Sequence, residues 1–197
     1  MLFGCRCGVC GRRGPSPCGI CVDRLVALEE IEVDGVDRCL ALLDYDAVSQ
    51  RLVAELKYIG VRTAVPWFAE ALAQRVEWAG EAVEHVTWIP AAPQNIRRRG
   101  FDQSEHVARR LGRVLDLPVG ALLDRHPDGG QTGRSREARL RGPALGVTDR
   151  GLRSSATVLI VDDVLTTGAS MAVAGQLLRD AGAGRVVGAV LAHRRFR

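Results

Sequence analysis

The chain has 197 residues, of which 47% are hydrophobic and 25% charged, and its formal net charge is +4. This composition is that of a folded globular chain and excludes wholesale disorder, and no apolar run reaches the roughly 18 residues of a transmembrane helix. The first residues lack the apolar stretch of a secretory signal, so we expect a cytoplasmic protein without membrane insertion. The mildly basic charge is compatible with phosphate-bearing ligands or nucleic acid and requires neither.

The head of the chain, residues 1–24, is rich in cysteine, glycine and arginine and has too few large apolar residues for a core of its own. It contains two C-x-x-C pairs separated by seven residues, Cys7 with Cys10 and Cys18 with Cys21. Four thiolates suit tetrahedral Zn²⁺, and in a cytoplasmic chain such pairs indicate a metal site before disulfides. We therefore predict a small structural zinc ribbon, in which Cys5 is an alternative to Cys7 or a spare thiol.

Residues 25–39 are expected to form a connector and residues 40–197 a folded domain. The periodicity of apolar residues predicts strands at 39–45, 85–91, 157–161 and 186–192, and helices at 46–58, 66–78, 102–115 and 170–181. The polar, glycine- and arginine-rich stretch at 124–148 is expected to be a long irregular loop. Strands that alternate with helices predict an α/β fold with a parallel, doubly wound sheet covered on both faces.

The clearest sign of a binding site is the segment VLIVDDVLTTGAS at residues 158–170. Its buried strand delivers Asp162 and Asp163 to the carboxyl edge of the sheet, where ligands of such folds bind. Two adjacent carboxylates can accept hydrogen bonds from the vicinal hydroxyls of a ribose and can hold water around Mg²⁺. The segment then enters a helix whose first N–H groups can bind phosphate, with Thr166, Thr167, Gly168, Ala169 and Ser170 as the candidate residues.

Two other interpretations of this segment are available. The acidic pair could merely end a strand while Ser170 caps a helix. Alternatively the segment could be the Walker B strand of an NTPase, which requires a G-x-x-x-x-G-K-[ST] loop. Lys57 is the only lysine and follows Ala54, Glu55 and Leu56, so that loop is absent from the sequence.

VLIVDDVLTTGAS closely resembles the motif of type I phosphoribosyltransferases that binds phosphoribosyl pyrophosphate (PRPP). The resemblance implies that Asp162 and Asp163 contact the ribose hydroxyls at the catalytic centre and that residues 166–170 hold the 5′-phosphate. The cysteine-rich head, Leu56-Lys57-Tyr58, RRRGFDQSEHVARRLG at 97–112 and QTGRSREAR at 131–139 resemble the ComF family. Its members are phosphoribosyltransferase-like proteins with an N-terminal zinc module, associated in some bacteria with DNA uptake.

In that family the pyrophosphate contacts come from an early loop, here residues 90–99, and from a segment before the PRPP strand. The candidates on the pyrophosphate side are Lys57, Arg97, Arg98, Arg99 and Arg139. Guanidinium groups match phosphate oxygens geometrically, although each arginine could equally belong to a solvated basic face and Lys57 to an exposed helix end.

Asp102 stands where the family has asparagine. We expect it to cap the following helix, with Glu105 completing a capping box. Arg139 lies in the long polar stretch, where the family has a flexible hood over the reaction centre.

Two functions follow from these patterns. The first is an enzyme that binds PRPP, or another ligand containing ribose 5-phosphate, and transfers a phosphoribosyl group with the help of Mg²⁺. Its histidines show no paired arrangement, so no general base is identified. The alternative is a DNA-uptake protein that binds single-stranded DNA through the zinc head and arginine-rich segments. The sequence leaves the oligomeric state open, with a homodimer among the alternatives.

Overall fold

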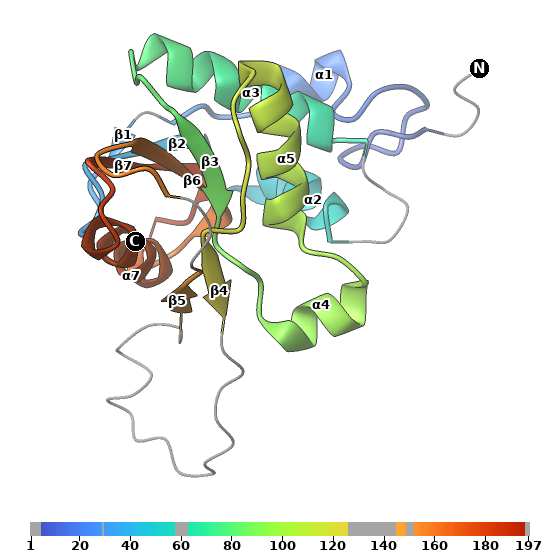
Figure 1. Cartoon of the computed structure of the whole chain (residues 1–197). Coiled ribbons are helices and arrows are strands. Elements are labelled where there is room, and N and C mark those ends of the chain that lie inside the picture. Colours follow the sequence, from blue (N-terminus) through green and yellow to red (C-terminus); the bar gives the residue numbers. More distant parts are fainter. Residues whose placement is uncertain (1–4, 29, 58–62, 126–144, 149–151, 196–197) are drawn as a thin grey trace.

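A computed structural model describes residues 5–28, 30–57, 63–125, 145–148 and 152–195, and Figure 1 shows their arrangement. A five-stranded sheet with the order β1-β2-β7-β6-β3 forms the centre. Its strands are β1 (Glu30–Ile31), β2 (Arg38–Asp44), β3 (His85–Trp88), β6 (Thr157–Leu165) and β7 (Arg185–His193). The pairs β2–β7, β7–β6 and β6–β3 are parallel, and β1 is antiparallel to β2.

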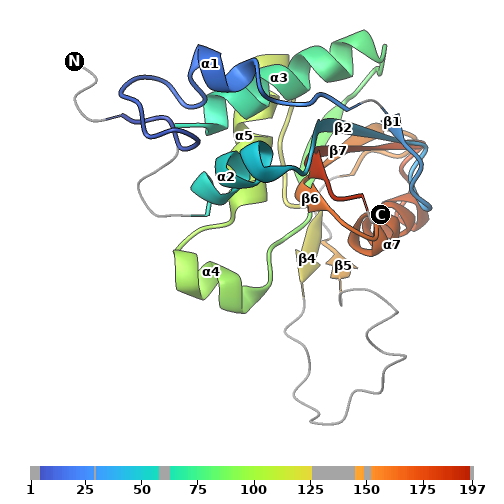
Figure 2. The same ribbon diagram turned by 180° about the vertical axis from the view of Figure 1, so that it is seen from behind.

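Helices cover both faces of the sheet (Figures 1 and 2). On one face lie α2 (Ala47–Glu55), α3 (Val65–Trp78) and α5 (Gln103–Leu115), and on the other lies α7 (Ala169–Asp180). Alternate residues of β6 follow this division, since Leu159 and Val161 join the core on the α3 and α5 side and Val158 and Ile160 join the core beneath α7. The predicted doubly wound α/β fold is therefore confirmed.

The strand β6 is longer than its apolar run indicated. It was predicted to end at Val161, but it continues to Leu165 because its pairing with β7 extends as far as Leu165 opposite His193. The acidic pair thus lies within the last part of the strand. Backbone pairing to a neighbour does not depend on side-chain polarity, so apolar periodicity could not locate this end.

Several short elements were not predicted. They are α1 (Gly19–Val22), β1, α4 (Pro93–Arg99), β4 (Leu123–Arg125) and β5 (Leu145–Val147). The last two pair as an antiparallel ribbon, so the ends of the expected loop at 124–148 are regular, while residues 126–144 lie outside the described part of the chain. Within the described ranges no helix is long and apolar enough to span a bilayer.

The described part of the head packs against α2 and α3, as Figure 2 shows. Cys7, Val9, Cys18 and Cys21 are buried and belong to the same hydrophobic cluster as Leu52 of α2. The stretch expected as a connector contributes β1, whose Glu30 and Ile31 lie opposite Leu40 and Cys39 of β2. The proposed boundaries at residues 24 and 39 remain predictions.

A tight turn between β1 and β2 rests on α7. Gly35 has φ +78°, and a Cβ atom there would lie 2.4 Å from the carbonyl oxygen of Ala172. A Cβ atom at Gly175 would lie 2.2 Å from the carbonyl oxygen of Gly35. Two glycines thus allow backbone to touch backbone, and no side chain fits at either position.

Candidate functional site

A hollow of about 250 Å³, called here the acid-pair hollow, opens where β3 and β6 end and α5 begins. Asp162 and Asp163 of β6 lie in its wall. The other polar lining residues are Lys57, Asn95, Arg99, Gln103, Ser104, Arg125 and Ser170. The carboxyl edge of the sheet therefore collects residues that are far apart in the sequence, as expected for this class of fold.

Asp163 is the centre of a chain of polar contacts. Its Oδ2 atom accepts a hydrogen bond from Nε2 of Gln103 at 2.9 Å and lies 3.5 Å from Nζ of Lys57. Gln103 in turn accepts a hydrogen bond from Nη1 of Arg99 at 2.8 Å. The amide thus links a guanidinium to the carboxylate, and two cations from different segments are held beside one acid.

Asp162 lies against the start of α5. Its Oδ1 atom accepts hydrogen bonds from the backbone N–H of Asp163 at 2.8 Å and from the hydroxyl of Ser104 at 3.4 Å. Burial raises the pKa of Asp162 to about 8, and the negative charges of Asp163 and Asp102 act in the same direction. Near neutral pH the unliganded site therefore holds a proton on this acid, which a bound cation or hydroxyl donor would change.

Asp102 caps α5, as predicted. Its side chain accepts hydrogen bonds from the backbone N–H groups of Ser104 and Glu105. It also accepts a hydrogen bond from the N–H of Ala91 at 2.7 Å, which fastens the chain after β3 to the helix start. The side chain of Glu105 accepts a hydrogen bond from Arg109 at 2.8 Å, so its expected role in a capping box is not what the structure shows.

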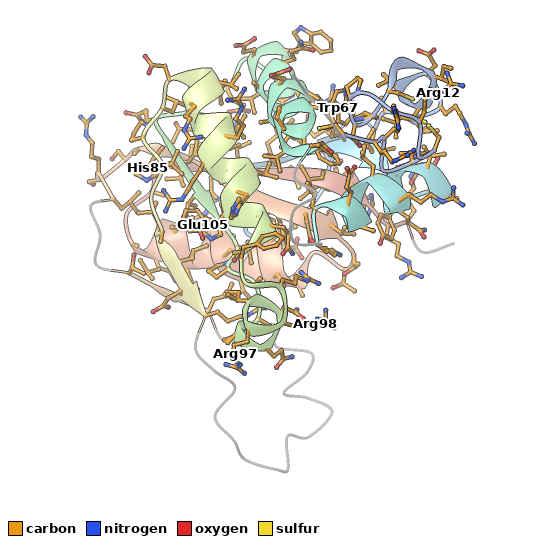
Figure 3. All side chains as sticks on the ribbon, turned by 90° about the vertical axis from the view of Figure 1, so that its right-hand side faces the viewer. Arg12, Trp67, His85, Arg97, Arg98 and Glu105 are labelled. Carbon is orange, nitrogen blue, oxygen red and sulfur yellow. The ribbon has the colours of Figure 1, made fainter. Side chains whose placement is uncertain are left out.

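The three predicted arginines after β3 do not act alike. Residues 90–99 were expected to be a loop, but the arginines form the last turn of α4, which ends at Arg99 and has Gly100 as its C-cap. Arg97 and Arg98 are exposed and point away from the sheet (Figure 3), whereas Arg99 lines the acid-pair hollow. Arg139 lies outside the described residues.

Sequence reasoning missed four polar residues of this hollow, which are Asn95, Gln103, Ser104 and Arg125. Gln103 and Ser104 lie inside the stretch 97–112 that carried the family resemblance, but only the capping role of Asp102 was considered there. Arg125 ends β4, donates a hydrogen bond to the carbonyl oxygen of Pro90 at 3.2 Å and brings a third cation to the hollow. Its position at the start of an arginine-rich stretch was the available signal.

The phosphate-loop candidates lie at the junction of β6 and α7. Gly168 is the N-cap of α7 with φ +79°, a conformation that favours glycine, so the interpretation in which Ser170 caps the helix is wrong. Ala169 N–H donates a hydrogen bond to the Thr167 hydroxyl at 3.4 Å. A glycine N-cap supplies no side chain to the first turn, which leaves backbone donors of that turn for a ligand.

These residues line a second hollow of about 390 Å³, called here the loop hollow. Thr166, Thr167, Gly168 and Ala169 form one wall, and the turn after β1 forms the other. Ser170 lies on the acid-pair side instead. The two halves of the motif therefore face two neighbouring hollows, with the strand-to-helix connection between them.

The four predicted cysteine ligands come together in the head. Cys7, Cys10, Cys18 and Cys21 have Sγ atoms that all lie within 4.8 Å of one another, and Sγ of Cys10 is 3.7 Å from Sγ of Cys18. A tetrahedron of thiolates around Zn²⁺ at about 2.3 Å has edges of about 3.8 Å, so the donor set and its size fit this ion.

The environment of Cys7 favours a thiolate. Burial raises its pKa, but hydrogen bonds from the backbone N–H groups of Cys18, Cys10 and Val9 outweigh that effect and lower the pKa to about 6. Burial raises the pKa of Cys21 to about 12. A bound cation would stabilise the thiolate form of all four residues.

Comparison with solved structures finds proteins of related fold. The glutamine PRPP amidotransferase of B. subtilis is 23% identical with a TM-score of 0.48, and the match covers 70% of this chain and 30% of that one. A purine phosphoribosyltransferase from Pyrococcus horikoshii is 21% identical with a TM-score of 0.46, covering 66% and 73% of the two chains. Adenine phosphoribosyltransferase from Leishmania donovani is 14% identical with a TM-score of 0.48, covering 83% and 86%. The chain thus spans less than a third of the amidotransferase.

No match was found among curated protein sequences. The family model described as the phosphoribosyl transferase domain matches residues 96–196, which is just over half of the chain and extends from α4 to the end of β7. That match includes both the start of α5 and the acidic strand with its loop, and the protein belongs to the phosphoribosyltransferase domain family.

Proposed function

We propose that the protein binds PRPP with Mg²⁺ and transfers its phosphoribosyl group to an acceptor, as a type I phosphoribosyltransferase. The observation that carries the proposal is the acid-pair hollow, where Lys57, Arg99 and Arg125 surround Asp162 and Asp163. Carboxylates suit ribose hydroxyls, while cations suit the pyrophosphate attached to the same sugar carbon. Binding of PRPP therefore requires carboxylates and cations in the same site.

Each part of the site has a task in such a reaction. The acidic pair would hold the ribose hydroxyls, the start of α7 with Thr166–Ser170 the 5′-phosphate, and the cations the pyrophosphate. The bond from C1 to the pyrophosphate oxygen breaks, the bond from C1 to an acceptor nitrogen forms, and the acceptor loses a proton. Mg²⁺, for which the carboxylate oxygens are suitable ligands, would neutralise charge on the leaving pyrophosphate. Catalysis then depends mainly on positioning and electrostatics.

Calorimetric titration with PRPP and Mg²⁺ tests this function. Wild-type protein should bind, and Arg99→Ala should weaken binding by about 10- to 100-fold, because a charge-assisted contact contributes about 1.5–3 kcal/mol. Arg97→Ala is the matched control, since Arg97 lies on the same turn of α4 but is exposed, and we expect less than a twofold change. A flat titration of the wild type would reject the proposal, and equal losses in both variants would reject the assignment of Arg99.

We further propose that the head is a zinc ribbon and that the chain is a ComF-type protein of a reducing compartment such as the cytoplasm. The compact set of four thiol groups supports the metal site. Purified protein should contain about one zinc ion per chain by mass spectrometry, and Cys21→Ser should lose it with unfolding of the head, because so small a module takes its folding energy from the metal. Undiminished metal content in that variant would contradict this assignment.

The DNA-handling alternative stays a prediction, as does the homodimer. If single-stranded DNA is the ligand, binding should weaken steeply as salt increases, because counterions are released from the phosphate backbone. Retention of DNA binding in Arg99→Ala, together with a flat PRPP titration, would favour that role over the enzymatic one.

A further inference from the structure

Glu55 is a buried carboxylate at the contact between the head and the domain. It is the last residue of α2 and is only 5% exposed. Its Oε1 atom accepts a hydrogen bond from the Thr63 hydroxyl at 2.6 Å, and its Oε2 atom accepts one from the Ser16 hydroxyl. Burying a carboxylate is costly unless it is hydrogen-bonded. The two hydroxyl donors therefore stabilise the buried position of Glu55.

The contact of Glu55 with the head involves both cysteine knuckles. Ser16 lies two residues before Cys18, and its oxygen accepts a hydrogen bond from the N–H of Gly8 at 3.0 Å. Gly8 lies between Cys7 and Cys10, and a Cβ atom there would be 2.1 Å from Oε2 of Glu55. The backbone of the first knuckle therefore rests on the carboxylate, and a hydroxyl beside the second knuckle donates to it. Only the folded head presents these groups together.

Glu55 lies two residues before Lys57, at the turn that ends α2. Leu56 is buried, the N–H of Lys57 donates a hydrogen bond to the carbonyl of Ala54 at 2.9 Å, and Nζ of Lys57 lies 3.5 Å from Asp163. Thr63, the second partner of Glu55, is the first described residue after this turn. One buried acid thus joins the head, the end of α2 and the residue that precedes the N-cap of α3, two positions from Lys57 in the acid-pair hollow.

We propose that Glu55 is a positioning residue through which the folded, metal-bearing head places Lys57 against the pyrophosphate end of PRPP. The proposal rests on the proposed function. It implies that metal occupancy of the head changes affinity for PRPP and, by reciprocity, that PRPP strengthens retention of the metal. Affinity for ribose 5-phosphate, which lacks the pyrophosphate, should change much less.

The test uses full-length, zinc-loaded protein and calorimetric titrations with PRPP and, separately, ribose 5-phosphate, both with Mg²⁺. Glu55→Gln should weaken binding of PRPP by about tenfold and binding of ribose 5-phosphate by less than about twofold. Lys57→Met should do the same, and the double variant should lose no more than Lys57→Met alone, because both changes remove one interaction. Glu77→Gln, an exposed glutamate of α3, is the matched control. Thr63→Val serves as a milder second variant should Glu55→Gln fold poorly.

Zinc release to a colorimetric chelator gives an independent measurement. Saturating PRPP should slow release from the wild type but not from Lys57→Met, and Glu55→Gln should release zinc faster than Glu77→Gln. Additive losses in the double variant, or equal weakening of PRPP and ribose 5-phosphate, would overturn the coupling alone. A wild-type protein that binds neither ligand would overturn the proposed function as well.

Discussion

Asp162→Asn is expected to stabilise the unliganded protein at alkaline pH and to abolish tight binding of PRPP. The pKa of Asp162 is raised to about 8 from 3.8, chiefly by burial. The folded state therefore holds a proton that the unfolded state has lost, and the free energy of unfolding falls as pH rises between these two values. Asparagine resembles the protonated acid and avoids this loss.

The size of the effect should depend on pH in a defined way. Each unit of pKa difference corresponds to about 1.4 kcal/mol, and we expect a gain of about 2–4 kcal/mol at pH 9, or roughly 5–10 °C in melting temperature. The gain should shrink steadily toward pH 4, where the wild type is also protonated. Thermal melts across this range provide the measurement, with the exposed Asp180→Asn as control. A gain that is independent of pH would contradict the assignment.

Glu81→Ala is expected to lower the free energy of unfolding of the domain. Glu81 lies between α3 and β3, its side chain is 5% exposed, and its carboxylate accepts hydrogen bonds from Arg185 at 2.9 and 3.0 Å and from Arg38 at 3.2 Å. These arginines begin β7 and β2, so the acid joins the amino ends of two central strands. Removing it leaves both guanidiniums without this partner, but both remain partly exposed to solvent, so we expect a cost of about 1–2 kcal/mol in free energy of unfolding.

The pH dependence of this loss has the usual sign for a paired acid. The hydrogen bond from Arg185, followed by that from Arg38, lowers the pKa of Glu81 below 4.5 despite its burial. Its contribution is complete above that value and is lost as pH falls through the lowered pKa. Urea unfolding should therefore show a larger difference from the wild type at pH 7 than at pH 3. The exposed Glu77→Ala should behave as wild type at both.

The sequence predicted the fold well because its long elements have strong apolar periodicity. Residues 158–161 of β6 and 186–192 of β7 are apolar runs, and Asp46 and Asp102 cap the starts of α2 and α5. The elements that were missed, such as β1 and β5, have two and three residues, which is too short for periodicity to register. Their existence depends on tertiary pairing with β2 and β4.

The site was predictable only where its residues are adjacent in sequence. Asp162 and Asp163 with the following loop form one segment, and the cysteine pairs form another. Gln103 contacts Asp163 across 60 positions, so nothing local to either residue indicates the contact. Likewise, Arg97, Arg98 and Arg99 are indistinguishable by sequence pattern. In the structure Arg97 and Arg98 are exposed on α4, whereas Arg99 lines the acid-pair hollow.

The contact of Gly35 with Gly175 has a consequence for how this protein accommodates ligands. The close approach of the two backbones restricts movement of α7 relative to the turn after β1, and Val33 of that turn lies close to Gly168. The two walls of the loop hollow are thus held in a fixed relation to each other. Any adjustment to ligands of different size is therefore expected in the acid-pair hollow, where Lys57, Arg99 and Arg125 come from three separate segments.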